Sequence, residues 1–184
     1  MKYFHLTAVM LAFLAVCIFV SPATAAAASA AEINRDARSA LAKLYAKSPA
    51  ARALGEKAKG ILVFPGIVKG GFIVGGQYGE GALFQGGKTT GYYSTVQASY
   101  GLQAGLQKFG YALFFVSDSV MNWFLKSEGW ELGVGPTIVV VDVGAAASAT
   151  TTTLQSEIYA FFFDQKGLMG GLGLQGTKVT KINK

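Results

Sequence analysis

The sequence has 184 residues and a formal net charge of +6, with 16 lysines and arginines against 10 aspartates and glutamates. Its only histidine, His5, and its only cysteine, Cys17, both lie near the N-terminus. If that end is removed on export, the remaining chain has no imidazole and no thiol. This excludes disulfides, thiol chemistry and zinc sites with the usual ligands, although a site built from carboxylates alone stays open.

The first 30 residues have the three parts of a secretory signal peptide. Lys2 supplies a positive charge, residues 6–20 form an apolar run, and small residues in an A-x-A pattern follow. The apolar run is shorter than the roughly 20 residues that a membrane span needs. We therefore predict a signal peptide at 1–30, cleavage between Ala25 and Ala31, and a periplasmic or secreted protein that associates peripherally with membrane.

Two other interpretations of this end stay open. Leu14-Ala15-Val16-Cys17 resembles a lipoprotein signal, in which Cys17 would carry the lipid, but Val16 stands where a small residue is expected. The second is an uncleaved membrane anchor, and the shortness of the apolar run counts against it.

The chain that follows predicts two helices. From Glu32 to Ser48, apolar residues recur at three- and four-residue steps, which is the pattern of one stripe on an amphipathic helix. Ser48 followed by Pro49 is typical of an N-cap and a first helical position. A short second helix is therefore expected through about Lys57, and Gly60 ends it.

The same stretch concentrates positive charge. Between Glu32 and Gly60, seven basic residues stand against three acidic ones. On an exported protein this excess indicates an anionic partner surface, and lipid is favoured over nucleic acid. The basic side chains spread around the polar arc of the first helix, so an ordinary surface helix docked on the rest of the protein is the alternative.

After Gly60 the sequence predicts strands. Glycines fall every few residues and separate apolar runs rich in β-branched and aromatic residues, which favour strands buried on both faces. These runs are 61–64, 72–74, 112–116, 138–141 and 158–163. From Val96 to Gln107, apolar residues alternate with glutamine, serine and glycine, so each kind lies on its own face. The expected fold is α+β and mainly β, an antiparallel β-barrel or sandwich-like core with N-terminal amphipathic helices and one inserted short helix.

Local signals place the connections. Gly86-Gly87 and residues 165–167 are predicted to form hairpin turns. Residues 117–119 are predicted to cap the inserted helix, which continues until Gly129. The low-complexity tract 145–153 is expected to be a loop or a weak edge strand.

Two glycine-rich patterns resemble phosphate-binding loops. Residues 82–89 approximate a phosphate loop that ends at Lys88-Thr89, but the residues that follow favour a strand, whereas the loop needs a helix there. Residues 171–176 spell a dinucleotide fingerprint, yet too few residues remain for the helix and second strand that it requires. Neither pattern predicts nucleotide binding.

The segment KAKGILVFP at 57–65, with VKGGF at 68–72 and GGQYGEG at 75–81, resembles the signature of the SYLF lipid-binding domain family, in its bacterial exported branch. The resemblance continues through GYYS at 91–94 to the C-terminus. It implies a single lipid-binding domain over residues 31–184 that binds membrane phospholipid. Phosphoinositides in eukaryotic members and actin in fungal ones are the family's other ligands, and neither is expected for a bacterial exported protein.

We therefore expect a phospholipid-binding protein that is not an enzyme, has no cofactor or metal, and binds neither nucleotide nor nucleic acid. Protein partners are not identifiable. A structural or protein-interaction module of the cell envelope without specific lipid binding is the alternative. A small outer-membrane barrel is disfavoured because apolar and polar residues would alternate along each of its membrane-spanning strands, whereas this sequence has continuous apolar runs. The residues predicted to contact anionic lipid are Arg35, Arg38, Lys43, Lys47, Arg52, Lys57, Lys59 and Lys69.

Overall fold

The computed structural model describes residues 28–127, 129–141, 156–167, 174 and 176–184. The predictions for the signal peptide, for Cys17, for the tract 145–153 and for most of the motif at 171–176 fall outside these residues. Among the described residues, no helix combines the length and the apolar character needed to cross a membrane.

Both N-terminal helices form where the sequence predicts them, as α2 (Ala30–Lys47) and α3 (Pro49–Lys57). Ser29 and Glu32 make a capping box at the start of α2, with the Ser29 backbone nitrogen donating to Glu32 Oε2 at 2.8 Å. Ser48 ends α2 and also caps α3, since its hydroxyl accepts from the backbone nitrogen of Ala51 at 3.1 Å. Local capping chemistry therefore sets the boundary between the helices.

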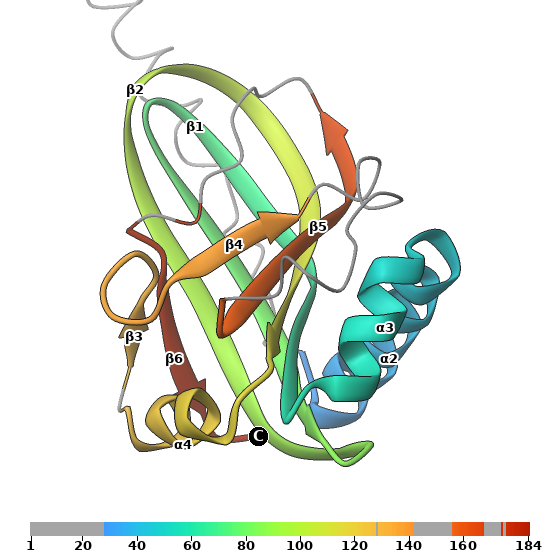
Figure 1. Cartoon of the computed structure of the whole chain (residues 1–184). Helices are drawn as coiled ribbons and strands as arrows, with labels where there is room; N and C mark the ends of the chain where they lie inside the picture. The colour runs from blue at the N-terminus through green and yellow to red at the C-terminus, as the bar shows by residue number, and fades with distance from the viewer. Residues whose placement is uncertain (1–27, 128, 142–155, 168–173, 175) are drawn as a thin grey trace, which may run out of the picture.

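Two long strands form the centre of the fold: β1 (Gly60–Gln85) and β2 (Lys88–Phe115), which pair antiparallel. Figure 1 shows that each strand doubles back, so that the bent β1 lies inside the bent β2. The pairing register shifts at residues 64–67 and 72–74. The prediction of separate short strands at 61–64 and 72–74 was wrong, because the intervening glycines bend the strand without ending it.

The remaining strands extend the sheet on both arms of β2. β5 (Ile158–Gly167) pairs antiparallel with the second arm, and β4 (Ile138–Val141) lies parallel to β5 at the edge. β6 (Lys178–Ile182) pairs with the first arm, and β3 (Trp130–Glu131) pairs with β6. The parallel β4–β5 pair departs from the antiparallel arrangement that we expected.

The inserted helix is α4 (Asp118–Lys126), capped by Ser117, whose hydroxyl accepts from the backbone nitrogen of Val120 at 3.2 Å. α2 and α3 lie against one side of the curled sheet and α4 lies away from them (Figure 1). The predicted class, α+β and mainly β with N-terminal helices and one inserted helix, is confirmed.

The apolar runs at 61–64, 112–115 and 158–163 are buried on both faces, as predicted, whereas the run at 138–141 forms the partly exposed strand β4. Leu62, Phe64 and Phe115 belong to a core cluster that packs against α4, whereas Val63 and Phe114 belong to a second cluster under α2 and α3. Successive side chains of a strand point to opposite faces, so a sheet covered on both sides needs continuous apolar runs.

The two predicted turns have different outcomes. Gly86 and Gly87 form the β1–β2 turn with φ of 54° and 77°, and Lys88 begins a strand, so the hairpin is confirmed. The turn predicted at 165–167 was wrong, because these residues continue β5, where Lys166 pairs with Lys108. The irregularity there is a bulge at Asp164, whose φ is 51°.

Candidate functional site

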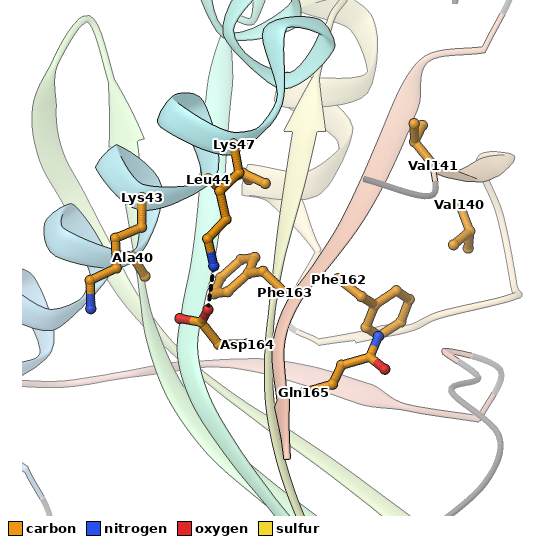
Figure 2. A pocket seen from close by; sticks show the side chains of 10 residues that line it. All are labelled: Ala40, Lys43, Leu44, Lys47, Val140, Val141, Phe162, Phe163, Asp164 and Gln165. Atoms are coloured by element: carbon orange, nitrogen blue, oxygen red, sulfur yellow. Dashed lines mark hydrogen bonds and ion pairs between the residues drawn. The ribbon is translucent and has the colours of Figure 1, made fainter. Parts of the chain in front are cut away.

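A pocket of about 380 Å³ lies between α2 and the strands β4 and β5. Its volume is within the roughly 300–1,000 Å³ of small-molecule sites. Figure 2 shows side chains from α2 on one side and those from β4 and β5 on the other. The lining residues are Ala40, Lys43, Leu44, Lys47, Val140, Val141, Phe162, Phe163, Asp164 and Gln165.

The walls of this pocket, which we call the α2–β5 pocket, are mainly apolar. Leu44 comes from the buried stripe of α2, and Phe163 comes from the continuous apolar run of β5. Val140 lies on the edge strand β4 and is 57% exposed, so its side chain is open to a ligand. An apolar group that entered this pocket would therefore be removed from water and pack against aliphatic and aromatic side chains, which is favourable.

Two of the predicted basic residues, Lys43 and Lys47, stand on the α2 side of the pocket, one helical turn apart. Lys47 Nζ reaches Asp164 Oδ1 at 3.2 Å across it (Figure 2). The two side chains are 62% and 38% exposed, so solvent screens this ion pair and it contributes at most about 1 kcal/mol. Another anion can therefore replace Asp164 as the partner of Lys47 with little loss of free energy.

Asp164 owes its position to the bulge in β5. The register of β2 and β5 shifts between Lys108 and Gly110, and Asp164 adopts a left-handed backbone conformation there. Aspartate tolerates that conformation better than most residues. The bulge turns the Asp164 carboxylate toward α2, where it meets Lys47.

A second hollow of about 840 Å³ adjoins the pocket and shares Ala40, Lys43 and Asp164 with it. We call it the α2–β1 hollow, because Ile33 and Asp36 of α2 face β1 across it. From β1 and β2 it is lined by Val68, Tyr78, Glu80 and Lys108, among others.

A charged network lies at the edge of this hollow. Lys184 Nζ bonds Glu80 Oε1 at 3.0 Å and donates to the backbone oxygen of Ala28 at 2.9 Å. Tyr78 donates its hydroxyl to Glu80 at 2.8 Å. Loss of solvation, together with this hydrogen bond, raises the pKa of Tyr78 to about 12, so the phenol stays a donor. The network joins the last residue of the chain to the start of α2.

Arg38 holds α2 on the β1–β2 turn. Its guanidinium donates to the backbone oxygen of Gly87 at 3.1 Å and to Thr89 Oγ1 at 3.4 Å. It also lies 4.8 Å from the centre of the Phe84 ring. Sequence reasoning placed Arg38 on a free polar arc, whereas it is engaged in docking the helix.

We expect Arg38→Ala to lower the free energy of unfolding by about 1–2 kcal/mol, because it removes charge-assisted hydrogen bonds and a cation–π contact. Arg35→Ala is the matched control and should leave stability unchanged, since the Arg35 side chain is 71% exposed and pairs with its sequence neighbour Asp36. Urea unfolding of both variants measures the difference. Equal stability of the two variants would contradict this role for Arg38.

The other predicted basic residues are dispersed. Arg52 lies 5.9 Å from the Tyr45 ring centre, and Lys59 Nζ pairs with Asp118 at 3.2 Å near α4. Lys57 is exposed at the end of α3, and Lys69 lies on β1. Of the eight residues, the structure brings only Lys43 and Lys47 to the α2–β5 pocket.

Sequence reasoning missed the wall of the pocket that β4 and β5 supply. Val140 and Phe163 stood in apolar runs that indicated only buried strands, and the edge position of β4 comes from pairing distant in sequence. The one local signal was Asp164, an aspartate at the end of an apolar run, which is a residue type suited to a bulge.

Residues 96–184 match the family model Ysc84, described as Las17-binding protein actin regulator. This is the family of the SYLF domain, so the resemblance to that family is confirmed over these residues, whereas the bacterial exported branch stays a prediction. The family is known for lipid binding and is not an enzyme family. The match includes the β4 and β5 side of the pocket, whereas α2 precedes it. A comparison with curated proteins finds no match.

Proposed function

Because residues 96–184 belong to the SYLF domain family, we propose that this protein is exported and binds anionic phospholipid at a membrane face. Lys43 and Lys47 contact the phosphate of the head group. Part of an acyl chain lies against Leu44, Val140 and Phe163 in the α2–β5 pocket.

The observation that carries this proposal is the pairing of two cations with an apolar pocket. A free inorganic anion would need the lysines alone, and a neutral apolar ligand would need the walls alone. An anionic amphiphile uses both, because apolar burial and charge attraction act on different parts of the same molecule. In this proposal a lipid phosphate replaces Asp164 as the partner of Lys47.

The remaining basic residues would act at longer range. Arg35, Arg52 and Lys57 are exposed on α2 and α3. Both helices lie on one side of the sheet (Figure 1), and α2 also lines the pocket. Charges within a Debye length of about 8 Å at physiological salt attract an anionic surface without forming specific contacts. These charges would therefore mainly raise the rate at which the protein meets the membrane. They would contribute less to the choice of which lipid is bound.

Co-sedimentation with vesicles tests the proposal. The protein should bind vesicles containing phosphatidylglycerol or cardiolipin, and bind phosphatidylcholine vesicles much more weakly. Raising salt from about 0.05 to 0.5 M should weaken the binding, since screening shortens the range of the attraction. Equal binding to neutral and anionic vesicles would refute the role of the lysines.

The alternative function is a structural or protein-interaction module of the cell envelope without specific lipid binding. The same experiment separates the two, because such a module would remain in the supernatant with every vesicle composition.

If the protein is exported, the contacts of its first described residues predict where the signal peptide is cleaved. Ala28 accepts the hydrogen bond from Lys184, and Ser29 caps α2, so a cut after either residue would remove contacts of the folded protein. Cleavage after Ala25 or Ala27 satisfies the A-x-A pattern and keeps both residues. We expect the intact mass of the protein recovered from the periplasm to begin at Ala26 or Ala28. A mass that starts at Cys17 with acyl groups would establish the lipoprotein interpretation in its place.

A further inference from the structure

Toward the bend where β1 and β2 double back, the central strands bury some polar side chains beside apolar ones such as Ile67 and Phe109, and expose several apolar side chains. Among the side chains described on either side of the bend, those at 67, 77, 95 and 107 are buried and those at 68, 78, 96 and 106 are exposed. Inside lie two glutamines, Gln77 and Gln107, which are only 5% and 4% exposed. Four of the outward side chains are apolar or aromatic and 47–67% exposed, namely Val68, Tyr78, Val96 and Leu106.

Exposed apolar side chains together with buried glutamines are not what a sheet with one face in water requires. A strand with one apolar and one polar face normally turns the apolar face to the core. Here Gln107 is inside, and its Oε1 accepts no hydrogen bond from any described residue. Burying an amide oxygen without a hydrogen bond is unfavourable, so the inward position of Gln107 does not itself stabilise the fold.

The apolar side chains also gather across the two strands. Tyr78 is the cross-strand partner of Val96, so these two lie side by side. Leu106 is opposite Gly70, which has no side chain to cover it. We call Val68, Tyr78, Val96 and Leu106 the outer face of the β1–β2 bend.

A pair of lysines borders this face. Val68 is opposite Lys108 in β2, and Lys108 is in turn opposite Lys166 in β5. Like charges directly across two strands repel each other. An anion bound between Lys108 and Lys166 would remove that repulsion, so this border favours an anionic partner.

We propose that the outer face of the β1–β2 bend docks on an anionic bilayer, with Leu106 and its apolar neighbours reaching below the head groups and Lys108 and Lys166 contacting phosphates. This inference rests on the proposed function and adds a second membrane contact to it. Val68, Tyr78 and Lys108 also line the α2–β1 hollow, which shares Lys43 with the α2–β5 pocket. One approach to the membrane could therefore engage both surfaces.

Vesicle binding of two leucine variants tests the inference. Leu106→Asp should lower affinity for phosphatidylglycerol vesicles at least tenfold, because an apolar contact is replaced by a charge of the wrong sign. Leu125→Asp, on α4 at 44% exposure, is the matched control and should bind as the wild type does. Unchanged thermal midpoints would show that both variants are folded.

The outcomes separate the two proposals. If the wild type binds no vesicle, the proposed function fails. If the wild type binds and Leu106→Asp binds equally well, only the docking surface proposed here is overturned. If Leu106→Asp instead converts a dimer to a monomer by light scattering with no change in vesicle affinity, the face is an interface between two copies, which also overturns the inference.

A depth measurement gives a direct reading. In the protein recovered from the periplasm, which lacks Cys17 after cleavage, Leu106→Cys or Leu125→Cys carries a nitrobenzoxadiazole label whose emission shifts to the blue in an apolar environment. Adding phosphatidylglycerol vesicles should shift the emission of the label at position 106 and leave that of a label at position 125 unchanged. Equal spectra at position 106 with and without vesicles would overturn the inference.

Discussion

Replacing Lys43 and Lys47 together with alanine should weaken binding to phosphatidylglycerol vesicles about thirtyfold. Each basic side chain near an anionic surface contributes about 1 kcal/mol, so two contribute about 2 kcal/mol. Their ion pairing in the free protein is weak, because the contact between Lys47 and Asp164 is solvent-exposed. The double variant should therefore keep its stability, and isothermal titration with vesicles would report the loss of affinity.

A variant matched in charge controls for this result. Lys178 and Lys181 are exposed on β6, which pairs with the first arm of β2, away from α2 (Figure 1). Changing both to alanine removes the same net charge at a distance from the pocket, and affinity should fall by less than about threefold through long-range attraction alone. If the two double variants lost affinity equally, total charge rather than the α2–β5 pocket would account for binding.

Gly81→Ala should lower the free energy of unfolding by about 3 kcal/mol, at the upper end of the cost of overpacking a core. A β-carbon at this position would overlap the backbone oxygen of Val63 and lie 2.7 Å from the Phe64 ring. Both atoms belong to the other arm of β1, which doubles back on itself there. A backbone oxygen cannot move aside as the end of a flexible side chain can, so the two arms would have to separate.

Gly76→Ala is the control on the same strand. Its β-carbon would meet only the backbone oxygen of Gln97, at 3.4 Å, and the position is exposed. We expect the free energy of unfolding to change by less than about 1 kcal/mol. Any change should be an increase, because alanine restricts the unfolded chain more than glycine does. Urea unfolding of both variants measures the contrast, and similar midpoints would show that the arms of β1 are not closely packed at Gly81.

The sequence alone determined the features that depend on neighbouring residues. The boundary of α2 and α3 follows from the hydroxyl of Ser48 and the fixed φ of Pro49, and both effects act within one helical turn. The β1–β2 turn follows from two glycines that can adopt positive φ. The apolar runs at 61–64, 112–115 and 158–163 correctly indicated strands covered on both faces, since burial on both sides removes the alternation of polar and apolar residues.

Only the tertiary structure decided the features that depend on distant residues. Lys43 and Arg38 are similar basic residues on one helix, yet one lines a pocket and the other contacts the Gly87 turn. The alternation from Val96 to Gln107 predicted two faces without showing which is inside, because period two is the same in either orientation. The Asp164 bulge and the place of β4 at the sheet edge likewise arise from strand pairing. Local sequence sets which conformations a segment favours, whereas packing between distant segments selects the neighbours of each side chain.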